Sequence, residues 1–167
     1  VEITATFFLI GFGIKSAVFP LYFWLPSSYH TPPSAVAATF GGLLTKVGIY
    51  ALFRVFSLLF IPNHCTKELL LSLAILTILT GAFGALIKTN IPRLFSYLIV
   101  CHIGFMIGGL GLYSKWALLG AVFYLIHDIM VKTNLFLIAG VVRQLRGTMD
   151  MGRLGGLYAQ YPKISLL

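Results

Sequence analysis

The chain has 167 residues, of which 59% are hydrophobic and only 10% charged, and its mean hydropathy is +0.96. Ordinary soluble domains carry about 25% charged residues, so this composition excludes a water-soluble globule. The excess of 12 Lys and Arg over 4 Asp and Glu would suggest a nucleic-acid partner in a soluble protein, but most of these bases fall in loops and at helix ends. We therefore expect the lipid bilayer, and no nucleic acid, as a partner.

Apolar windows along the chain have about the 20 residues that a membrane-spanning helix needs. The segments between them collect proline, charged and polar residues, which do not remain unsatisfied in hydrocarbon. The sequence shows no strand alternation, so it predicts an all-α, polytopic transmembrane helix bundle, with some helices interrupted, as a single domain over residues 1–167. The five predicted spans are Ile3–Trp24, Ala35–Phe60, Leu69–Ile87, Ile91–Leu112 and Trp116–Val142.

The two ends and the cysteines limit the interpretation further. The chain begins VEITATFF, without a basic segment and cleavage site, and it ends in ISLL, which resembles the start of a sixth helix. We expect no signal peptide and interpret the chain as an excerpt of a larger subunit. Cys65 and Cys101 have neither CxxC nor metal-ligand spacing, so we expect no disulfide framework and no metal site.

The bases predict an orientation. Five alternating helices place more Lys and Arg on one side of the bilayer, and the positive-inside rule makes that side cytoplasmic. The cytoplasmic group comprises Lys88, Arg93, Arg143, Arg146 and Arg153, and the opposite group comprises Arg54, Lys67 and Lys115.

Lysines lie near the middle of the first two spans. Lys15 is in GFGIKSAVFPLYFWLP and Lys46 in LLTKVGIYALFR. A charge at bilayer depth costs about 3 kcal/mol or more, so such residues normally face a protein interior or a water-filled path. Lysine suits a proton relay because desolvation lowers its pKa and a nearby carboxylate raises it again. Both lysines are therefore candidate relay residues.

Pro20 predicts a break in the first helix. Its ring removes one backbone donor and clashes one turn back, at Ser16, which frees a carbonyl beside Lys15 for water or a cation. Transporters line midplane sites with interrupted helices of this kind.

The fifth span carries three titratable side chains in YLIHDIMVKTN, namely His127, Asp128 and Lys132. Regular helical geometry would pair Asp128 with Lys132, four residues later. His127 would approach Lys132 only through a π-bulge or a break. We favour such an irregularity between Ile126 and Asn134, because charged groups at this depth need water and freed backbone groups.

His102, in the fourth span, is either a further relay group or a hydrogen-bonded packing histidine. A remote alternative from another class is a membrane haem protein with His102 and His127 as axial ligands, but this leaves the buried lysines unexplained. The sequence has no nucleotide-binding loop, catalytic triad or metal cluster, so we expect no active site and no cofactor. The GFG, GG and GLG runs suit close packing of membrane helices.

The order of several blocks resembles the antiporter-like membrane subunits. This family comprises the large subunits of Mrp-type multisubunit cation/proton antiporters and the homologous proton-pumping subunits of respiratory complex I. The segments LLTKVGIYALFR and HDIMVKTNLFL are most similar to the D-type subunit of the Mrp antiporters. The blocks are GIKSAVFPLYFWLP, PPSAVAATFGGLLTKVGIYALFR, IPRLFSYLIVCHIGFMIGGLGL, LIHDIMVKTNLFLIAG and MGRLGGL.

The resemblance implies roles by position. Lys15 corresponds to the lysine of the family's broken helix, which pairs with a glutamate on an earlier helix, and Lys46 corresponds to the next relay lysine. His102 and the stretch from His127 to Lys132 fall on the family's central polar axis, a hydrated row along the membrane plane.

The resemblance also implies a function. It implies a membrane subunit of a multisubunit Na+/H+ antiporter in a bacterial or archaeal cell membrane, with other membrane subunits as partners and with protons and Na+ as transported ions. The alternative is a proton-pumping translocase subunit of NADH:quinone oxidoreductase.

This chain departs from the family pattern in four respects. The glutamate partner of Lys15 and the exit residue of the second half are absent from these 167 residues. Asp128, rather than His127, lies four residues before Lys132, where many members have histidine. The family usually has an acidic residue near Ser27, and this chain has none in that loop.

Overall fold

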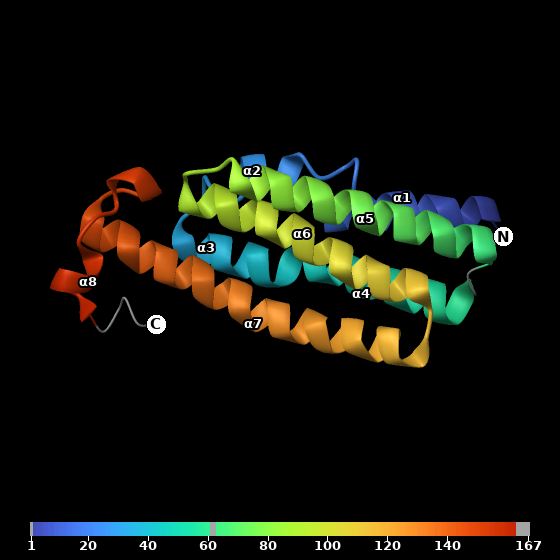
Figure 1. Cartoon of the computed structure of the whole chain (residues 1–167). Coiled ribbons are helices and arrows are strands. Elements are labelled where there is room, and N and C mark those ends of the chain that lie inside the picture. Colours follow the sequence, from blue (N-terminus) through green and yellow to red (C-terminus); the bar gives the residue numbers. More distant parts are fainter. Residues whose placement is uncertain (1, 61–62, 163–167) are drawn as a thin grey trace.

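The computed structural model describes residues 2–60 and 63–162, which form a bundle of helices (Figure 1). No strand occurs in these two ranges, and one isolated bridge pairs Asn90 with Asp150. The sixth helix expected at ISLL lies outside the described residues. The α-helices are α1 (Glu2–Ser16), α2 (Trp24–Ser28), α3 (Ser34–Thr39), α4 (Thr45–Arg54), α5 (His64–Leu86), α6 (Ile91–Leu112), α7 (Lys115–Arg146) and α8 (Leu157–Gln160).

Three short segments of the described ranges have other helical geometry. Two are π-helical: η1 (Phe40–Leu44) joins α3 to α4, and η2 (Val55–Leu59) extends α4. The third, η3 (Met151–Arg153), is a 3-10 turn before α8.

Four of the five predicted spans are present as long apolar helices. They are Ser34–Leu59, which runs from α3 through η2, and the helices α5, α6 and α7. The first predicted span, Ile3–Trp24, is not continuous, because its apolar helix ends at Ser16. The fold is therefore the predicted all-α membrane bundle, with a first helix shorter than the sequence suggested.

The end of α1 confirms the predicted helix break. Ala17 has a left-handed φ of 59°, and the Val18 amide donates to the carbonyl of Gly13 at 3.0 Å, which closes the last turn. The indole of Trp24 then donates to the carbonyl of Ile14 at 2.9 Å and ties the start of α2 to this end. Pro20 lies within the irregular segment between the two helices, as expected from its missing amide.

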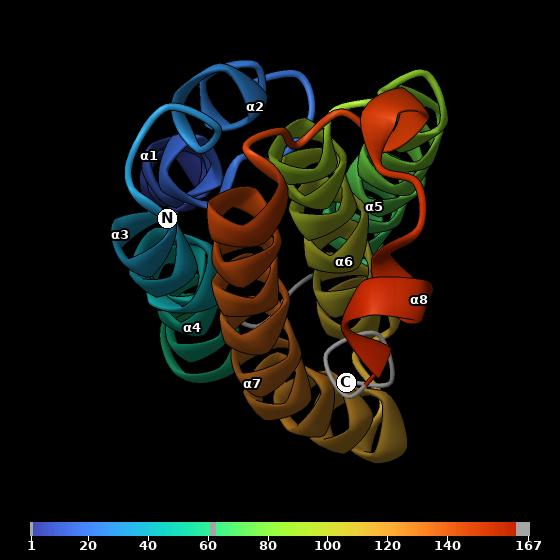
Figure 2. The ribbon, with the colours of Figure 1, turned by 90° about the vertical axis from the view of Figure 1, so that its left-hand side faces the viewer.

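Small residues set the spacing between the central helices. Figure 2 shows α5, α6 and α7 side by side, with α1, α3 and α4 on the other side of α7. A Cβ added at Gly81 of α5 would overlap the backbone of Cys101 on α6, and one at Gly109 would lie 2.6 Å from the Cβ of Ala121 on α7. The interpretation of GG and GLG as close-packing positions is confirmed here, whereas that of GFG is wrong, because a Cβ at Gly11 would have nothing within 4 Å.

The bases separate to the two ends of the bundle as the alternation of helices predicted. At one end the guanidinium of Arg93 donates to the Nε2 of His30 at 3.2 Å. At the other end the Lys67 ammonium lies 5.1 Å from the ring centroid of Tyr113. Which end is cytoplasmic stays a prediction.

Candidate functional site

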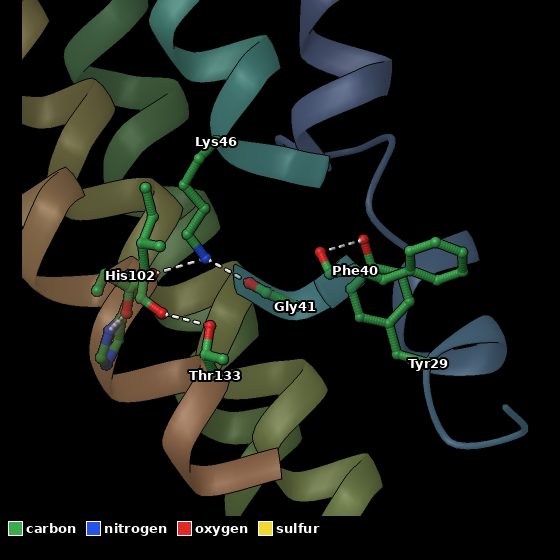
Figure 3. A network of polar contacts seen from close by, with 8 residues as sticks. Tyr29, Phe40, Gly41, Lys46, His102 and Thr133 are labelled. Carbon is green, nitrogen blue, oxygen red and sulfur yellow. Dashed lines mark hydrogen bonds and ion pairs between the residues drawn. The ribbon is translucent and has the colours of Figure 1, made fainter. Parts of the chain in front are cut away.

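The first π-helical segment positions Lys46. The segment contains Gly41 and Gly42 and ends at Leu44, directly before the first residue of α4. Lys46 therefore lies in the first turn of α4. Its ammonium donates to the carbonyl of Gly41 at 2.8 Å (Figure 3). Only 2% of the Lys46 side chain is exposed. Segments of π-helix are frequent at functional sites because their carbonyls are displaced from the regular hydrogen-bonding pattern.

Glycines allow this segment to approach α7. A Cβ at Gly42 would collide with the hydroxyl of Thr133, and a Cβ at Gly41 would lie 2.8 Å from the ring of Phe136. Residues with side chains would hold the two helices farther apart. The two glycines therefore bring Lys46 within reach of α7.

The beginning of the π-helical segment is also fixed from outside. The hydroxyl of Tyr29, in the turn between α2 and α3, donates to the carbonyl of Phe40 at 3.2 Å (Figure 3). Burial raises the pKa of this hydroxyl, so it remains a donor.

Asp128 of α7 joins Lys46 to His102. One carboxylate oxygen lies 2.8 Å from the Lys46 ammonium, and the other lies 2.6 Å from the Nδ1 of His102 on α6. The contact with Lys46 is close but is not aligned as a hydrogen bond. The three side chains therefore connect α4, α7 and α6, and Asp128 itself is 1% exposed. We call Lys46, Asp128 and His102 the buried triad.

The triad can hold its proton in two places. A protonated lysine, a carboxylate and a neutral imidazole have zero net charge, and so do a neutral lysine, a carboxylate and an imidazolium. A proton can therefore pass from one side of Asp128 to the other without leaving an unbalanced buried charge, the state that is most costly in a protein interior.

His102 extends the polar region toward the outside of the bundle. Its side chain is 26% exposed, and its ring centroid lies 5.5 Å from that of Tyr124. The ring of Tyr124 in turn lies 6.1 Å from that of His127, which is exposed on α7. Tyr124 thus lies between the two predicted histidines. No pattern in the sequence indicated its position.

The fifth predicted span corrects two expectations. Helix α7 is regular through the stretch from Ile126 to Asn134, so the predicted irregularity is wrong. Within the described chain, the carboxylate of Asp128 pairs across helices with Lys46 and His102, and no ion pair joins it to Lys132. The irregular backbone lies on the facing helix, in η1, so α7 needs no break of its own.

Lys132 and Lys15 have different surroundings. Lys132 is 1% exposed and lies one turn beyond Asp128. Lys15 occupies the last turn of α1 and lines an open groove of about 440 Å³ with Phe12 and Val47. Its side chain is exposed within the described chain, so the expected burial is not found there. The triad does not include it.

One sequence signal could have pointed to the cross-helix pair. Asp128 is the only acidic residue within the five predicted spans, which contain three lysines, Lys15, Lys46 and Lys132. With three lysines and one carboxylate, the count predicts that the lysines compete to pair with Asp128. Spacing along α7 alone would favour Lys132 as the partner.

The chain matches a known family of membrane proteins. Residues 1–167 match the family model described as NADH:quinone oxidoreductase/Mrp antiporter, transmembrane. The chain belongs to this family. Membership in the NADH:quinone oxidoreductase/Mrp antiporter family confirms the resemblance seen in the sequence and confirms that the chain is a membrane protein.

Relatives within the family are similar over almost the whole chain. The chain is 48% identical over 164 residues to the D-type subunit of the Na(+)/H(+) antiporter of Alkalihalophilus pseudofirmus, covering 96% of this chain and 33% of that protein. It is 42% identical to the subunit of the same name from Bacillus subtilis, covering 97% of this chain and 33% of that protein. The chain thus spans about a third of the length of these relatives.

Two solved complexes of the family contain the same fold. A chain of the Mrp complex from Dietzia has a TM-score of 0.94 and 30% identity, over 99% of this chain and 31% of that one. A chain of respiratory complex I from Thermus thermophilus has a TM-score of 0.90 and 30% identity, over 97% of this chain and 35% of that one. Both are multisubunit membrane complexes.

Proposed function

We propose that the chain is part of a membrane subunit of a multisubunit Na+/H+ antiporter in a bacterial or archaeal cell membrane. Its partners are the other membrane subunits of that complex. The transported ions are protons and Na+. The similarity to relatives named as D-type antiporter subunits favours this function over that of a complex I subunit.

The buried triad moves protons in this proposal. Lys46, once protonated, passes its proton along Asp128 to the Nδ1 of His102, which is unprotonated before the transfer, and the net charge of the triad is the same before and after this step. Lys132, buried one turn beyond Asp128, is the next basic group along α7. His127 follows on the outer face of the same helix, and Lys15 supplies protons from the groove beside α1.

The observation that carries the proposal is the ion pair between Lys46 and Asp128. Two oppositely charged groups that are 2% and 1% exposed lie 2.8 Å apart between two membrane-spanning helices. Buried ion pairs contribute little net stability, and ionisable residues at membrane depth mark ion pathways. A role in ion transport accounts for a pair that stability alone does not require.

The test is Na+-dependent proton exchange by the intact complex in inverted membrane vesicles. We expect Lys46→Ala and Asp128→Asn to abolish the collapse of a pH gradient on Na+ addition, with the exchange rate expressed per assembled complex because each change also lowers stability. Lys67→Ala is the matched control, because Lys67 lies at the end of the bundle beside Tyr113. Normal exchange by assembled Lys46→Ala would contradict the proposal.

The same vesicles distinguish the complex I alternative, which the solved structure from Thermus thermophilus supports. A subunit of NADH:quinone oxidoreductase would acidify the vesicle interior on addition of NADH, without a requirement for Na+. An antiporter subunit responds to Na+ and not to NADH.

A further inference from the structure

Several hydroxyl groups on the described helices donate to the backbone of their own helix. In a helix, Ser and Thr bond readily to the carbonyl of the preceding turn, which satisfies the hydroxyl without another partner. The described residues that do this are Ser27, Thr39, Ser72, Thr77, Thr80, Ser96 and Thr133.

Ser16 and Thr45 depart from this pattern. Both side chains are 0% exposed, and neither hydroxyl has a hydrogen-bonding partner among the described residues. A buried hydroxyl without a partner costs about 1–3 kcal/mol, and buried polar groups in native proteins are bonded to protein or to water. The two residues stand next in sequence to Lys15 and Lys46.

The structure explains why Thr45 lacks the usual bond. The carbonyl one turn before it belongs to Gly41, and the Lys46 ammonium donates to that carbonyl at 2.8 Å. That carbonyl already accepts from a side-chain donor, and the hydroxyl of Thr45 makes no bond to it.

Ser16 is directed at α4. A Cβ added at Gly48 would collide with the Ser16 hydroxyl and would lie 3.2 Å from the Cγ of Lys15. The end of α1 thus rests on α4 at a position where only glycine leaves space.

Helical geometry places Thr45 between these two contacts. Successive residues of an α-helix are turned by about 100°, so Thr45 lies about 60° from Gly48 and about 100° from Lys46, on opposite sides. Gly48 marks the face that meets Ser16, and Lys46 marks the face that meets Asp128. Thr45 therefore lies on the route around α4 from the end of α1 to the buried triad.

We propose that the hydroxyls of Ser16 and Thr45 form a water-binding bridge that carries protons between Lys15 and Lys46. Each hydroxyl accepts a proton on its oxygen and releases its own proton to the next oxygen, so a proton moves on and both side chains end unchanged. Ammonium groups at both ends of this route disfavour a bound metal cation and favour neutral water. The inference rests on the antiporter function proposed above and adds two proton-carrying residues to it.

The experiment compares variants at Thr45 in the intact complex, in inverted vesicles. Thr45→Val removes the hydroxyl and keeps the shape, and we expect the exchange rate to fall at least about tenfold. Thr45→Ser keeps the hydroxyl and should stay within about twofold of the wild type. Thr80→Val is the matched control, because the Thr80 hydroxyl donates to Leu76 of its own helix at 2.8 Å.

Three further measurements separate the bridge from a packing role. Ser16→Ala should slow exchange like Thr45→Val, and the double variant should be no slower than either single one, because both act on one route. The ratio of rates in H2O and D2O should increase in Thr45→Val, as proton transfer becomes limiting. The Na+ concentration for half-maximal exchange should stay unchanged.

Several outcomes would overturn the inference. If Thr45→Ser exchanged as slowly as Thr45→Val, side-chain packing would be responsible for the loss. If only the Na+ concentration for half-maximal exchange rose, the hydroxyls would bind the cation. If the wild-type complex exchanges Na+ for protons and both Thr45→Val and Ser16→Ala keep full activity, the water-binding bridge is refuted and the antiporter function is not. No exchange by the wild-type complex would remove the antiporter function as well. If Thr45→Val fails to assemble, Ser16→Ala and its isotope ratio decide.

Discussion

Lys46 on α4 and Asp128 on α7 form an ion pair of 2.8 Å in which both side chains are almost completely buried. The ammonium donates to the carbonyl of Gly41, and the second carboxylate oxygen contacts His102 at 2.6 Å. Each charge is therefore balanced only while the other is present. Removing one partner leaves a buried charge, whereas removing both leaves a neutral site.

This relationship predicts strongly non-additive effects on stability. We expect Lys46→Met and Asp128→Asn each to lower the free energy of unfolding by about 3–5 kcal/mol, because each leaves one charge unpaired. The double variant should lose much less than the sum of the two. Thermal unfolding of the detergent-solubilised complex measures this cycle, and simple addition of the two losses would show that the pair is not coupled.

The hydrogen bond from His102 to Asp128 predicts a separation of stability from transport. Asparagine can place an N–H close to the position of the imidazole Nδ1, but it cannot carry a proton. We therefore expect His102→Asn to retain thermal stability within about 1 kcal/mol and to lose exchange by at least about tenfold. His102→Ala should lose both.

The control for His102 is His64→Asn, since His64 is exposed and pairs with Glu68 on its own helix. Normal exchange by His102→Asn would show that His102 holds Asp128 in place and does not carry protons.

The fold was largely predictable because bilayer physics leaves few alternatives. Long apolar windows must become helices, since the backbone has to satisfy its own hydrogen bonds in hydrocarbon. Pro20 marked the end of α1 for a local reason, its missing amide. These features depend on composition and on neighbours in sequence.

The site was predictable only as a set of residues. The importance of Lys46, Asp128 and His102 followed from the cost of polar groups at membrane depth. Their pairing did not follow, because it depends on how closely α4 approaches α7. That approach results from Gly41, Gly42 and a π-helical segment, none of which has a periodicity that a sequence pattern reveals.

Gly42 provides a direct test of this close approach. A Cβ at Gly42 would collide with the Thr133 hydroxyl and would lie 3.4 Å from the carbonyl of Ile129. We expect Gly42→Ala to cost about 1–3 kcal/mol of stability and to reduce exchange, because α4 and α7 must separate. Thermal unfolding and vesicle exchange are the two measurements.

Two variants complete the test at Gly42. Adding Thr133→Ala should restore part of both losses, because it removes the group that the new methyl would strike. Gly120→Ala on α7 is the control, since a Cβ there has nothing within 4 Å, and alanine favours a helix over glycine. Equal effects of Gly42→Ala and Gly120→Ala would contradict the packing argument.

The native cysteines test the orientation predicted from the bases. Cys65 is exposed at the end of the bundle that carries Lys67, and Cys101 is buried between α5 and α6. The positive-inside rule places the opposite, more basic end in the cytoplasm, so Cys65 should face outward. A membrane-impermeant maleimide added to intact cells should therefore label the subunit, and Cys65→Ser should abolish the labelling while Cys101→Ser leaves it unchanged. Labelling of Cys65 in inverted vesicles but not in intact cells would reverse the orientation.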